Sequence, residues 1–393
     1  MRHLRSLLVL ALIFPSTLAS QSVLGSSGLG MKLEPLDAIQ RALGGVGVTT
    51  LTATVLPGNP VTSLDVLAPT ITFTVQPHWG KYSVGSEKGN FVGTRFPLLG
   101  FAYPLGTDGV FTLTAVSQFD QNWSVESTDS VVTGGESVGI TDTFLSDGGI
   151  VAVQAGWARR WSTTLAFGAT LGFYSGGLTR SFTRAFDQET ADSVALGSPI
   201  SPFATGGRWI HSGRLASLNV AWDPSSSLLV GTTVAWGGTI KVDPAEGAEG
   251  VRRKVSVPLE LKVSTTAVLS PSLSLNVGVA SSNWTDLGDP SINAAGAGRV
   301  MSYGAGVEWE VTNFWAGGFP LRFGFHRSVL PFRFSGKKVK ESAISFGFSV
   351  VMVQALGLPL AAVDVAFESG NRNSGAFGET FRRLTVTTRV GGR

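Results

Sequence analysis

The side chains that most often carry out chemistry are few in this sequence and lie far apart. Its 393 residues contain no cysteine and only four histidines, His3, His78, His211 and His326. None of the four has other metal-ligating side chains at a spacing typical of a metal site. We interpret the last three as residues of a pore interior or rim. We therefore expect no catalytic residue, no metal and no cofactor, and no enzyme activity.

Charged residues in the second half of the chain form a better-defined set. Arg322, Glu341, Asp364, Glu368 and Arg383 all fall on the polar face of runs that alternate polar and apolar residues. Glu368 and Arg383 lie at matching heights in the last two runs, where opposite charges stabilise the pairing of strands. We interpret this pair as two charges that neutralise each other on the water-facing inner wall. The alternative is that Arg322 or Arg383 binds the carboxylate of a ligand.

These charges are positioned by runs whose side chains repeat every two residues. The clearest lies between Arg252 and Ala280, with a turn at Ser270 and Pro271. One face carries Val255, Val257, Leu259, Leu261 and Val263, then Leu273, Leu275, Val277 and Val279; the other carries charges, hydroxyls and glycine. A period of two indicates strands, and about ten tilted residues span a bilayer. An apolar face beside a polar face predicts a transmembrane β-hairpin with lipid outside and a polar lumen inside.

Similar runs recur from residue 68 to the end of the chain. They cover 68–76, 91–103, 110–123, 151–157, 165–173, 218–222, 230–236, 303–311, 321–325, 344–348, 361–368 and 383–390. Counting strands between the breaks gives about fourteen, an even number as expected for a bacterial barrel. The fold class is therefore all-β, a transmembrane antiparallel β-barrel at 68–393. It must close on itself, because an open edge in hydrocarbon leaves peptide groups unpaired.

The connections between the runs predict which end of the barrel faces which side of the membrane. Short turns near Leu105, Arg160, Asp223, Pro271, Ala316 and Gly357 alternate with longer polar segments at 127–147, 186–207, 243–250 and 283–298. Short turns of bacterial barrels face the periplasm and long loops face the exterior. Trp157, Trp161, Trp222 and Trp309 end their runs and fit an interfacial girdle.

The amino terminus and the composition predict export. Arg2 and Arg5 precede the apolar run 7–14, and small residues follow at Thr17 and Ala19, so we expect a signal peptide at 1–19. The net charge of +3 is too weak to suggest a nucleic-acid partner. We expect a chain in the bacterial outer membrane, surrounded by its lipid. A closed barrel needs no second subunit to pair its strands, so we expect a monomer.

Between the signal peptide and the first run, residues 20–67 are rich in glycine and follow no strand rhythm. The segment contains Ser27, Gly28, Leu29 and Gly30, then Gly44, Gly45 and Gly47, and finally Asn59 and Pro60. Glycine permits the tight backbone paths that a confined space requires. We expect a plug folded inside the barrel; a disordered leader is the alternative.

Taken together, these pieces resemble the FadL-type outer-membrane transporters of long-chain fatty acids and other hydrophobic compounds. The glycine-rich start with Asn59-Pro60 is similar to the plug of that family. Leu330-Pro331-Phe332 followed by Glu341 is similar to a late hairpin, and Glu368-Ser369-Gly370 with the run 379–384 is similar to the closing hairpin. The resemblance implies a plugged barrel of fourteen strands and a hydrophobic ligand that leaves sideways through a gap in the wall.

Gly148 and Gly149 are candidates for that gap, because glycine weakens strand pairing; a glycine turn at a loop end is the alternative. We expect an outer-membrane channel that passively admits hydrophobic small molecules and whose plug rearranges on binding. The alternatives are a binding or assembly module of a secretion system and a general porin.

Overall fold

The computed structural model describes residues 22–85, 87–133, 136–187, 201–289, 296–311, 319–355, 358–375 and 377–392. The predicted signal peptide lies outside these residues. So do most of the connection at 186–207 and the turns near Ala316 and Gly357.

Strands dominate the described residues. They are β1 (Met31–Lys32), β2 (Thr70–Val84), β3 (Glu87–Leu105), β4 (Gly109–Asp120), β5 (Trp123–Thr133), β6 (Glu136–Arg160), β7 (Leu165–Phe186), β8 (Phe203–Ser225), β9 (Leu228–Trp236), β10 (Thr239–Pro244), β11 (Arg253–Ser256), β12 (Glu260–Ser270), β13 (Leu273–Trp284), β14 (Gly298–Val311), β15 (Phe319–Phe334), β16 (Lys337–Ala355), β17 (Leu358–Ser374) and β18 (Phe377–Gly391). The helical elements are η1 (Val23–Ser26), α2 (Ala38–Ala42) and η2 (Pro60–Ser63). None of the described helices is long and apolar enough to cross a membrane.

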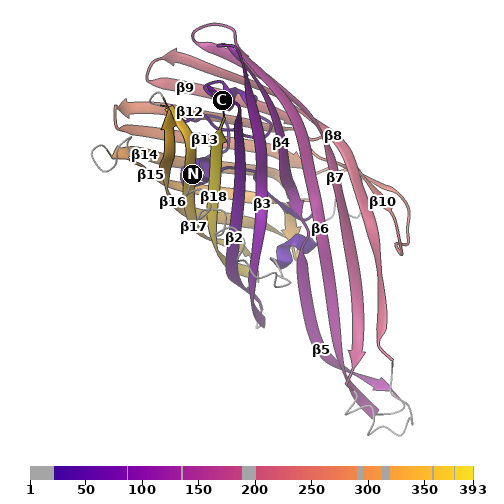
Figure 1. Cartoon of the computed structure of the whole chain (residues 1–393). Helices are drawn as coiled ribbons and strands as arrows, with labels where there is room; N and C mark the ends of the chain where they lie inside the picture. Colours follow the sequence, from indigo (N-terminus) through magenta and orange to yellow (C-terminus); the bar gives the residue numbers. More distant parts are fainter. Residues whose placement is uncertain are drawn as a thin grey trace, which may run out of the picture.

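Fourteen of the strands close into an antiparallel barrel, as the sequence predicts (Figure 1). Their order is β2, β3, β4, β6, β7, β8, β9, β12, β13, β14, β15, β16, β17 and β18, and β18 pairs with β2 from Phe377↔Val84 to Gly391↔Thr70. The remaining strands are not members of this ring: β5 pairs with β6, β10 pairs with β8 and β11, and β1 pairs with β4. Each strand of the ring pairs with a neighbour on both sides, as crossing hydrocarbon requires, although β3 and β4 pair over only part of their length.

The two ends of the barrel differ. We call the end that carries Thr70 and Gly391 the terminal rim; the tight turns after β3, β6, β8 and β12 lie there too. Trp157, Trp161, Trp222 and Trp309 are 48%, 80%, 50% and 49% exposed near this rim, as a girdle requires. The opposite end, where β2 turns into β3 and β17 into β18, is called the distal rim.

Side chains alternate across the wall as predicted. On β15 and β16, Phe323, Phe325, Ile344 and Phe346 are exposed outside, while Arg322, Glu341 and Ser345 are buried inside. Two predicted outward residues are wrong: Val255 is fully buried among interior residues, and Val257 packs against the same cluster. The polypeptide leaves regular strand geometry between β11 and β12, around Pro258, so the alternation does not continue through that break.

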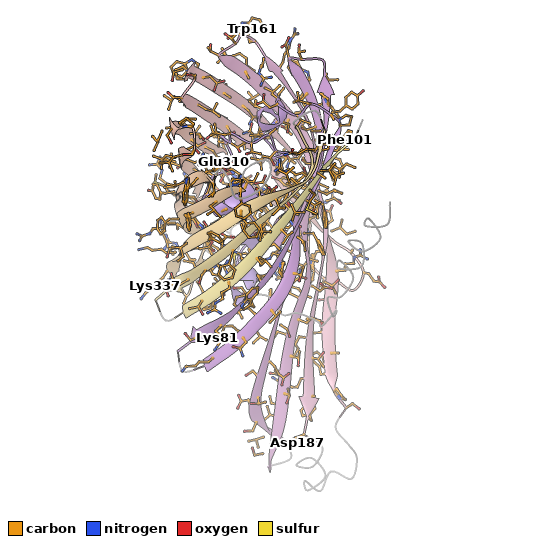
Figure 2. The ribbon with its side chains drawn as sticks, turned by 60° about the vertical axis from the view of Figure 1, so that its left-hand side comes forward. Lys81, Phe101, Trp161, Asp187, Glu310 and Lys337 are labelled. Atoms are coloured by element: carbon orange, nitrogen blue, oxygen red, sulfur yellow. The ribbon has the colours of Figure 1, made fainter. Side chains whose placement is uncertain are left out.

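The predicted loop at 127–147 is also wrong, because this segment forms β5 and the first half of β6. Both faces of these strands meet water, so their sequence lacks an apolar face and is polar and glycine-containing like that of a loop. With β7, β8 and β10 they form a sheet that projects beyond the barrel at the distal rim (Figure 1). Figure 2 shows Asp187 at the tip of this sheet and Trp161 at the other end of the molecule.

Candidate functional site

Residues 22–66, the N-terminal segment, contact the inward face of strands all around the barrel. The contacts fall on glycines. A Cβ on Gly304 of β14 would lie 1.6 Å from the carbonyl oxygen of Gly44, and one on Gly324 of β15 would lie 2.4 Å from the Gly44 nitrogen. Other inward glycines meet this segment in the same way: Gly100 meets Val55, Gly156 meets Pro60, Gly168 meets Val61, Gly231 meets Thr49, Gly278 meets Val46, Gly306 meets Leu43 and Gly347 meets Ala42. The bare backbone of the wall makes room for the segment.

Hydroxyl and amide side chains of the wall hold the same segment. Thr49 N donates to Ser264 Oγ at 3.0 Å, and Asn276 Nδ2 donates to Thr49 Oγ1 at 3.1 Å. On the other side, Asn219 Nδ2 donates to the Gly58 carbonyl at 2.8 Å. These buried hydrogen bonds satisfy backbone groups that would otherwise be unpaired in the interior.

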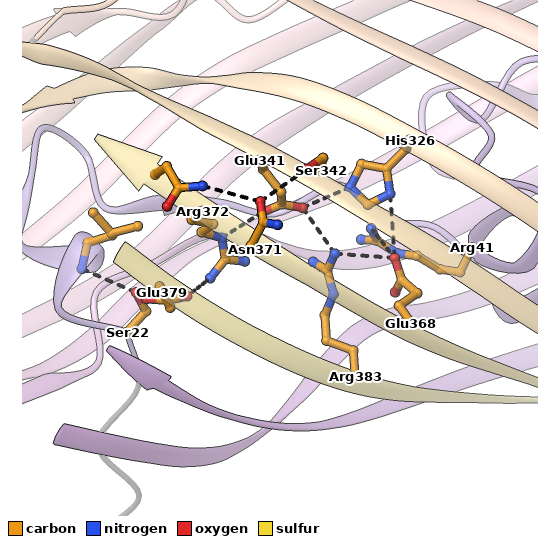
Figure 3. Close-up of polar contacts among 12 residues, drawn as sticks. Ser22, Arg41, His326, Glu341, Ser342, Glu368, Asn371, Arg372, Glu379 and Arg383 are labelled. Atoms are coloured by element: carbon orange, nitrogen blue, oxygen red, sulfur yellow. Dashed lines mark hydrogen bonds and ion pairs between the residues drawn. The ribbon is translucent and has the colours of Figure 1, made fainter. Parts of the chain in front are cut away.

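A chain of charges lines the lumen on β15 to β18 (Figure 3). We call it the lumen network: His326, Glu341, Glu368, Arg372, Glu379 and Arg383. At its centre, Glu341 accepts from Arg372 Nε at 2.6 Å, from Arg383 Nη2 at 3.0 Å and from His326 Nε2 at 2.9 Å. Arg383 Nη2 also donates to Glu368 Oε1 at 3.2 Å. The predicted pairing of Glu368 with Arg383 is confirmed, since the two are direct partners across β17 and β18.

An aromatic ring supports the two arginines of the network. Phe381 lies between them on β18, with its centroid 4.4 Å from the guanidinium carbon of Arg372 and 4.3 Å from that of Arg383. Such cation–π contacts favour arginine, whose planar group stacks and still donates in its plane. The ring therefore fixes both guanidinium groups beside the carboxylates.

The N-terminal segment reaches this network at two points. Ser22 donates to Glu379, which also binds Arg372, and Arg41 of α2 lies 3.9 Å from Glu368 Oε1. Figure 3 shows Ser22 and Arg41 approaching the network from opposite sides. Any outward movement of the segment must therefore release partners of two buried carboxylates.

A second cluster joins the segment to β12, and we call it the quartet: Lys32, Glu34, Glu260 and Lys262. Lys32 Nζ lies 2.6 Å from Glu260 and 3.0 Å from Glu34, and Lys262 Nζ lies 3.2 Å from Glu34 and 3.4 Å from Glu260. Burial by itself raises the pKa of the Glu34 carboxyl, but Lys262 and Lys32 outweigh it and hold that pKa well below its usual range. Glu34 is therefore ionised at neutral pH.

Two cavities meet at the quartet. One, of ≈ 80 Å³, is lined by the lumen network, Arg41 and Arg95; the other, of ≈ 90 Å³, is lined by Phe119, Tyr174 and Trp284. Lys32, Glu34, Glu260 and Lys262 line both. For comparison, a cavity of roughly 150 Å³ holds benzene. Neither chamber has room for a solute as large as benzene, and the quartet lies between them.

A third set of charges lies nearer the terminal rim. Arg389 donates to Asp364 from Nε at 2.7 Å and from Nη2 at 3.0 Å, and Arg322 Nη1 donates to Ser349 at 2.6 Å. Ser349 in turn donates to Asp364, and Arg322 pairs with Glu308. Arg322 and Asp364 are thus joined through Ser349, apart from the lumen network.

The wall itself is interrupted between β3 and β4. β3 pairs with β2 from Glu87 to Ala102 but with β4 only from Leu98 to Leu105. Past Val116, the free edge of β4 is taken by β1, with Met31 opposite Asp120 and Lys32 opposite Phe119. Leu33 N also donates to the Gln118 carbonyl at 2.9 Å. A short piece of the N-terminal segment therefore stands where a neighbouring strand would otherwise pair.

One ion pair bridges this interruption. Arg95 on β3 donates from Nε to Asp120 on β4 at 2.8 Å, and both side chains are buried. Removing a partner from a buried pair is costly, because the other charge remains without water. The two sides of the break are thus held together by side chains and by the N-terminal segment.

The structure places the residues predicted for the plug as follows. Gly28, Gly30, Gly44 and Gly47 have positive φ, Ser27 ends η1, and Gly45 packs against Gln40. Leu29 is buried against the interior apolar cluster and its carbonyl accepts from Gln121. Asn59 donates to the Val48 carbonyl at 2.8 Å and Pro60 begins η2. The predicted segment is therefore internally braced rather than extended.

Gly148 and Gly149, the residues predicted for a wall gap, lie in β6 and pair with Leu178 and Gly177 of β7. They stand opposite the point where β4 ends and β5 begins: Gln121 N donates to the Gly148 carbonyl at 3.0 Å. The break described above lies on the other side of β4.

Several residues of the site were missed by the sequence analysis. Arg372 and Glu379 lie on inward positions of the predicted runs, so alternation alone could have marked them as lumen residues, as it did for His326. Arg41, Lys32 and Glu34 could not be found in this way, because they belong to the irregular N-terminal segment. Their partners, such as Glu260, lie more than two hundred residues away along the chain.

The described residues give little support for two other kinds of site, a metal site and a serine nucleophile. Within the described residues, no group of three histidine, aspartate or glutamate side chains could hold a metal ion. The spacing of Gly135, Ser137 and Gly139 matches a nucleophile elbow, but Ser137 is the second residue of β6 and pairs with Val132 of β5 in a β-hairpin. A nucleophile elbow requires a sharp turn from strand to helix.

No model of a known protein family matches the sequence, and no curated protein matches it. Several solved structures do match the structure of this chain. A FadL homologue of Pseudomonas aeruginosa aligns with a TM-score of 0.61 at 10% identity, over 93% of this chain and 100% of that one. The chain has the FadL-type barrel fold.

Two further structures extend this likeness. The toluene transporter TodX of Pseudomonas putida aligns with a TM-score of 0.59 at 12% identity, over 92% of this chain and 99% of that one. The toluene transporter TbuX of Ralstonia pickettii gives 0.57 at 14% identity, over 92% and 99%. The resemblance stated from the sequence is confirmed for the fold along nearly the whole chain.

Proposed function

We propose that this protein is a channel of the bacterial outer membrane that passively admits hydrophobic small molecules, such as long-chain fatty acids or monoaromatic hydrocarbons. In this proposal the N-terminal segment is a plug that rearranges on binding, and the ligand leaves sideways through the wall between β3 and β4. The terminal rim faces the periplasm. An apolar solute gains nothing from release into water if it can pass directly into lipid.

The observation that carries the proposal is the interrupted wall. A barrel that only conducts polar solutes along its axis has no use for a break in its hydrogen-bonded ring, which costs several kcal/mol for each peptide group left unpaired in lipid. Here the break is kept, and β1 and the Arg95–Asp120 pair cover it. Movement of β1 would open a path from the lumen to the membrane.

An apolar path leads toward that break from the projecting sheet. Near the tip the tilted rings of Phe144 and Phe182 have centroids 4.8 Å apart, and the ring of Phe203 lies 6.2 Å from that of Phe182. Further in, an apolar cluster joins residues of the wall to Leu29 of the N-terminal segment; it includes Phe119, Ile150, Tyr174 and Trp284. Aromatic and aliphatic linings of this kind are typical of sites for small apolar ligands.

The small cavities support a plug that must move. Chambers of ≈ 80 and ≈ 90 Å³ cannot hold a fatty acid, and the quartet closes the passage between them. Arg41 Nε, Arg383 Nε and Glu368 Oε2 are buried without a hydrogen-bond partner beside the first chamber. A ligand with a polar head could satisfy such atoms once the segment has shifted.

Deletion of residues 21–56 tests the proposal. In planar bilayers the wild-type protein should show little ion conductance, while the deletion variant should conduct steadily, because its lumen is no longer filled. Wild-type protein in vesicles should also speed the entry of oleate or toluene. A general porin would conduct ions in both forms. A secretion or assembly module would show no saturable uptake of either solute.

A further inference from the structure

The outer wall at the distal rim changes abruptly from polar to apolar. One row of outward residues runs across six neighbouring strands, from β15 to β3, and its members are directly opposite each other: Arg327, Ser342, Asn371, Thr380, Lys81 and Asn90. Two residues closer to the terminal rim, the next row holds Phe325, Ile344, Ser369, Arg382, Trp79 and Val92. Two residues span about 7 Å along a strand.

On β15 to β18 the row after that is apolar. It includes Phe323, Phe346 and Phe367, which are 51%, 38% and 39% exposed. The polar row therefore lies where the wall leaves hydrocarbon and meets the headgroups. Figure 2 shows Lys81 and Lys337 well away from Trp161, which marks the terminal rim.

Two hollows lie side by side on this boundary, over β2, β3, β17 and β18. The first has a volume of ≈ 820 Å³ and is lined by Lys81, Arg382, Trp79 and Asn371. The second has a volume of ≈ 630 Å³ and is lined by Lys81, Asn371 and Lys88. Lys81 and Asn371 thus stand between two depressions that each have a second cation.

The charge of these hollows is uncompensated among the described side chains. Lys81, Lys88 and Arg382, which we call the basic wall patch, are exposed, and none of them forms an ion pair with a described carboxylate. Glu379 borders the second hollow, but its carboxylate binds Arg372 and Ser22 in the lumen. Three cations beside hydrocarbon with no acid attract an anionic headgroup.

We propose that the basic wall patch binds the bisphosphorylated glycolipid lipid A from the outer leaflet. Each phosphate occupies one hollow and accepts charge-assisted hydrogen bonds, from Arg382 and Lys81 in the first and from Lys81 and Lys88 in the second. Asn371 lies between them, where its amide can bond sugar hydroxyls. The acyl chains follow the apolar rows past Trp79 and Phe367, whose rings lie 6.5 Å apart.

This inference rests on the membrane placement of the proposed function and is independent of transport. Two adjoining cationic hollows suit a headgroup with two phosphates better than a glycerophospholipid with one. The distal rim also faces the exterior in that placement, and lipid A is the phosphorylated lipid of the outer leaflet.

The test is native mass spectrometry of the full chain in detergent micelles, titrated with diphosphoryl lipid A or with phosphatidylglycerol. The wild-type protein should bind one molecule of diphosphoryl lipid A and bind phosphatidylglycerol more weakly. The triple variant K81Q/K88Q/R382Q should lose about 100-fold in affinity, since each cation near a membrane surface contributes about fivefold. All three side chains point outward, so the barrel should still fold.

Two control proteins complete the design. K81R/K88R/R382K keeps the charges and should bind as the wild type does, and R214Q removes an exposed outward cation on β8, outside both hollows. Equal binding by the triple variant, or equal affinity of the wild type for phosphatidylglycerol, overturns the proposal. Solute entry measured on the same preparations separates the lipid site from the channel function: a wild-type protein that binds no lipid A but still speeds solute entry refutes only the lipid site.

Discussion

Glu341 is the residue on which the lumen network depends most, because it accepts hydrogen bonds from three side chains on three strands. Glu341→Gln keeps the shape but removes the charge between Arg372 and Arg383. Removing one member of a buried ion pair typically costs 3 to 5 kcal/mol, so we expect the free energy of unfolding to fall by about 3 kcal/mol. Urea unfolding in detergent micelles, followed by tryptophan fluorescence, measures this.

The control for that substitution is Glu126→Gln, which changes an exposed carboxylate on β5 by the same chemistry. Exposed charges contribute roughly 0 to 1 kcal/mol, so this variant should unfold like the wild type. An equal effect of both substitutions would mean that the network does not brace the barrel.

Glu34 gives the N-terminal segment a defined response to acid. Its pKa in the folded protein is held below the ordinary value of about 4.3, so the attachment it provides is complete above that pH and weakens as pH falls below it. A spin label on Ser27→Cys, in a chain without native cysteine, should stay immobile from pH 8 to 5 and become mobile in stronger acid. In a Glu34→Gln protein the label should be more mobile already at pH 7. Identical spectra for the two proteins at pH 7 would contradict the role of Glu34.

At the scale of single residues, the sequence predicts only those positions that follow from the alternation of polar and apolar side chains along a strand. The Glu368–Arg383 pair was predictable because both residues lie on adjacent strands of one hairpin, where matching heights follow from counting. The contacts of Arg41 and Lys32 were not, because nothing local shows where an irregular segment will rest inside a barrel.

At the scale of elements, the inward glycines are the most specific feature of the wall. The three atoms nearest to a Cβ on Gly304 all belong to Gly44 and Gly45 of the N-terminal segment. Gly304→Val should therefore leave the barrel folded but displace residues 42–45, and so raise ion conductance in planar bilayers toward that of the deletion variant. Gly378→Ala is the matched control, because a Cβ there lies at ordinary distances of 3.4 and 3.6 Å from its neighbours. Unchanged conductance of Gly304→Val would show that the segment does not block the pore.

The strands themselves were largely predictable, since the alternation on β13 to β18 is continuous. The errors share one cause. The segment 127–147 and Val255 lie where the sheet is wetted on both faces or interrupted, so the difference between the two faces that identifies a membrane strand is absent there. The projecting sheet could therefore not be distinguished from loops.

For the molecule as a whole, the glycine-rich composition and the N-terminal segment explain each other. A barrel of fourteen strands has an interior too narrow for a folded segment between full-sized side chains. Glycines on eight strands, from β3 to β16, provide that space. The interior thus holds a folded segment while much of the outer wall stays apolar, and beside β4 the short strand β1 replaces a neighbouring strand of the wall.

The break between β3 and β4 can be tested by locking it. Leu33 and Gln118 are joined by a backbone hydrogen bond, and continuing the β1–β4 register places them opposite each other, within the Cα separation that a disulfide needs. The double variant Leu33→Cys/Gln118→Cys, once oxidised, should take up toluene or oleate into vesicles at least tenfold more slowly, and reductant should restore uptake. The oxidised pair Val365→Cys/Val386→Cys, which joins β17 to β18 on the outer wall, should change nothing. Unimpaired uptake by the locked protein would mean that β1 does not move during passage, and that hydrophobic solutes leave by another route.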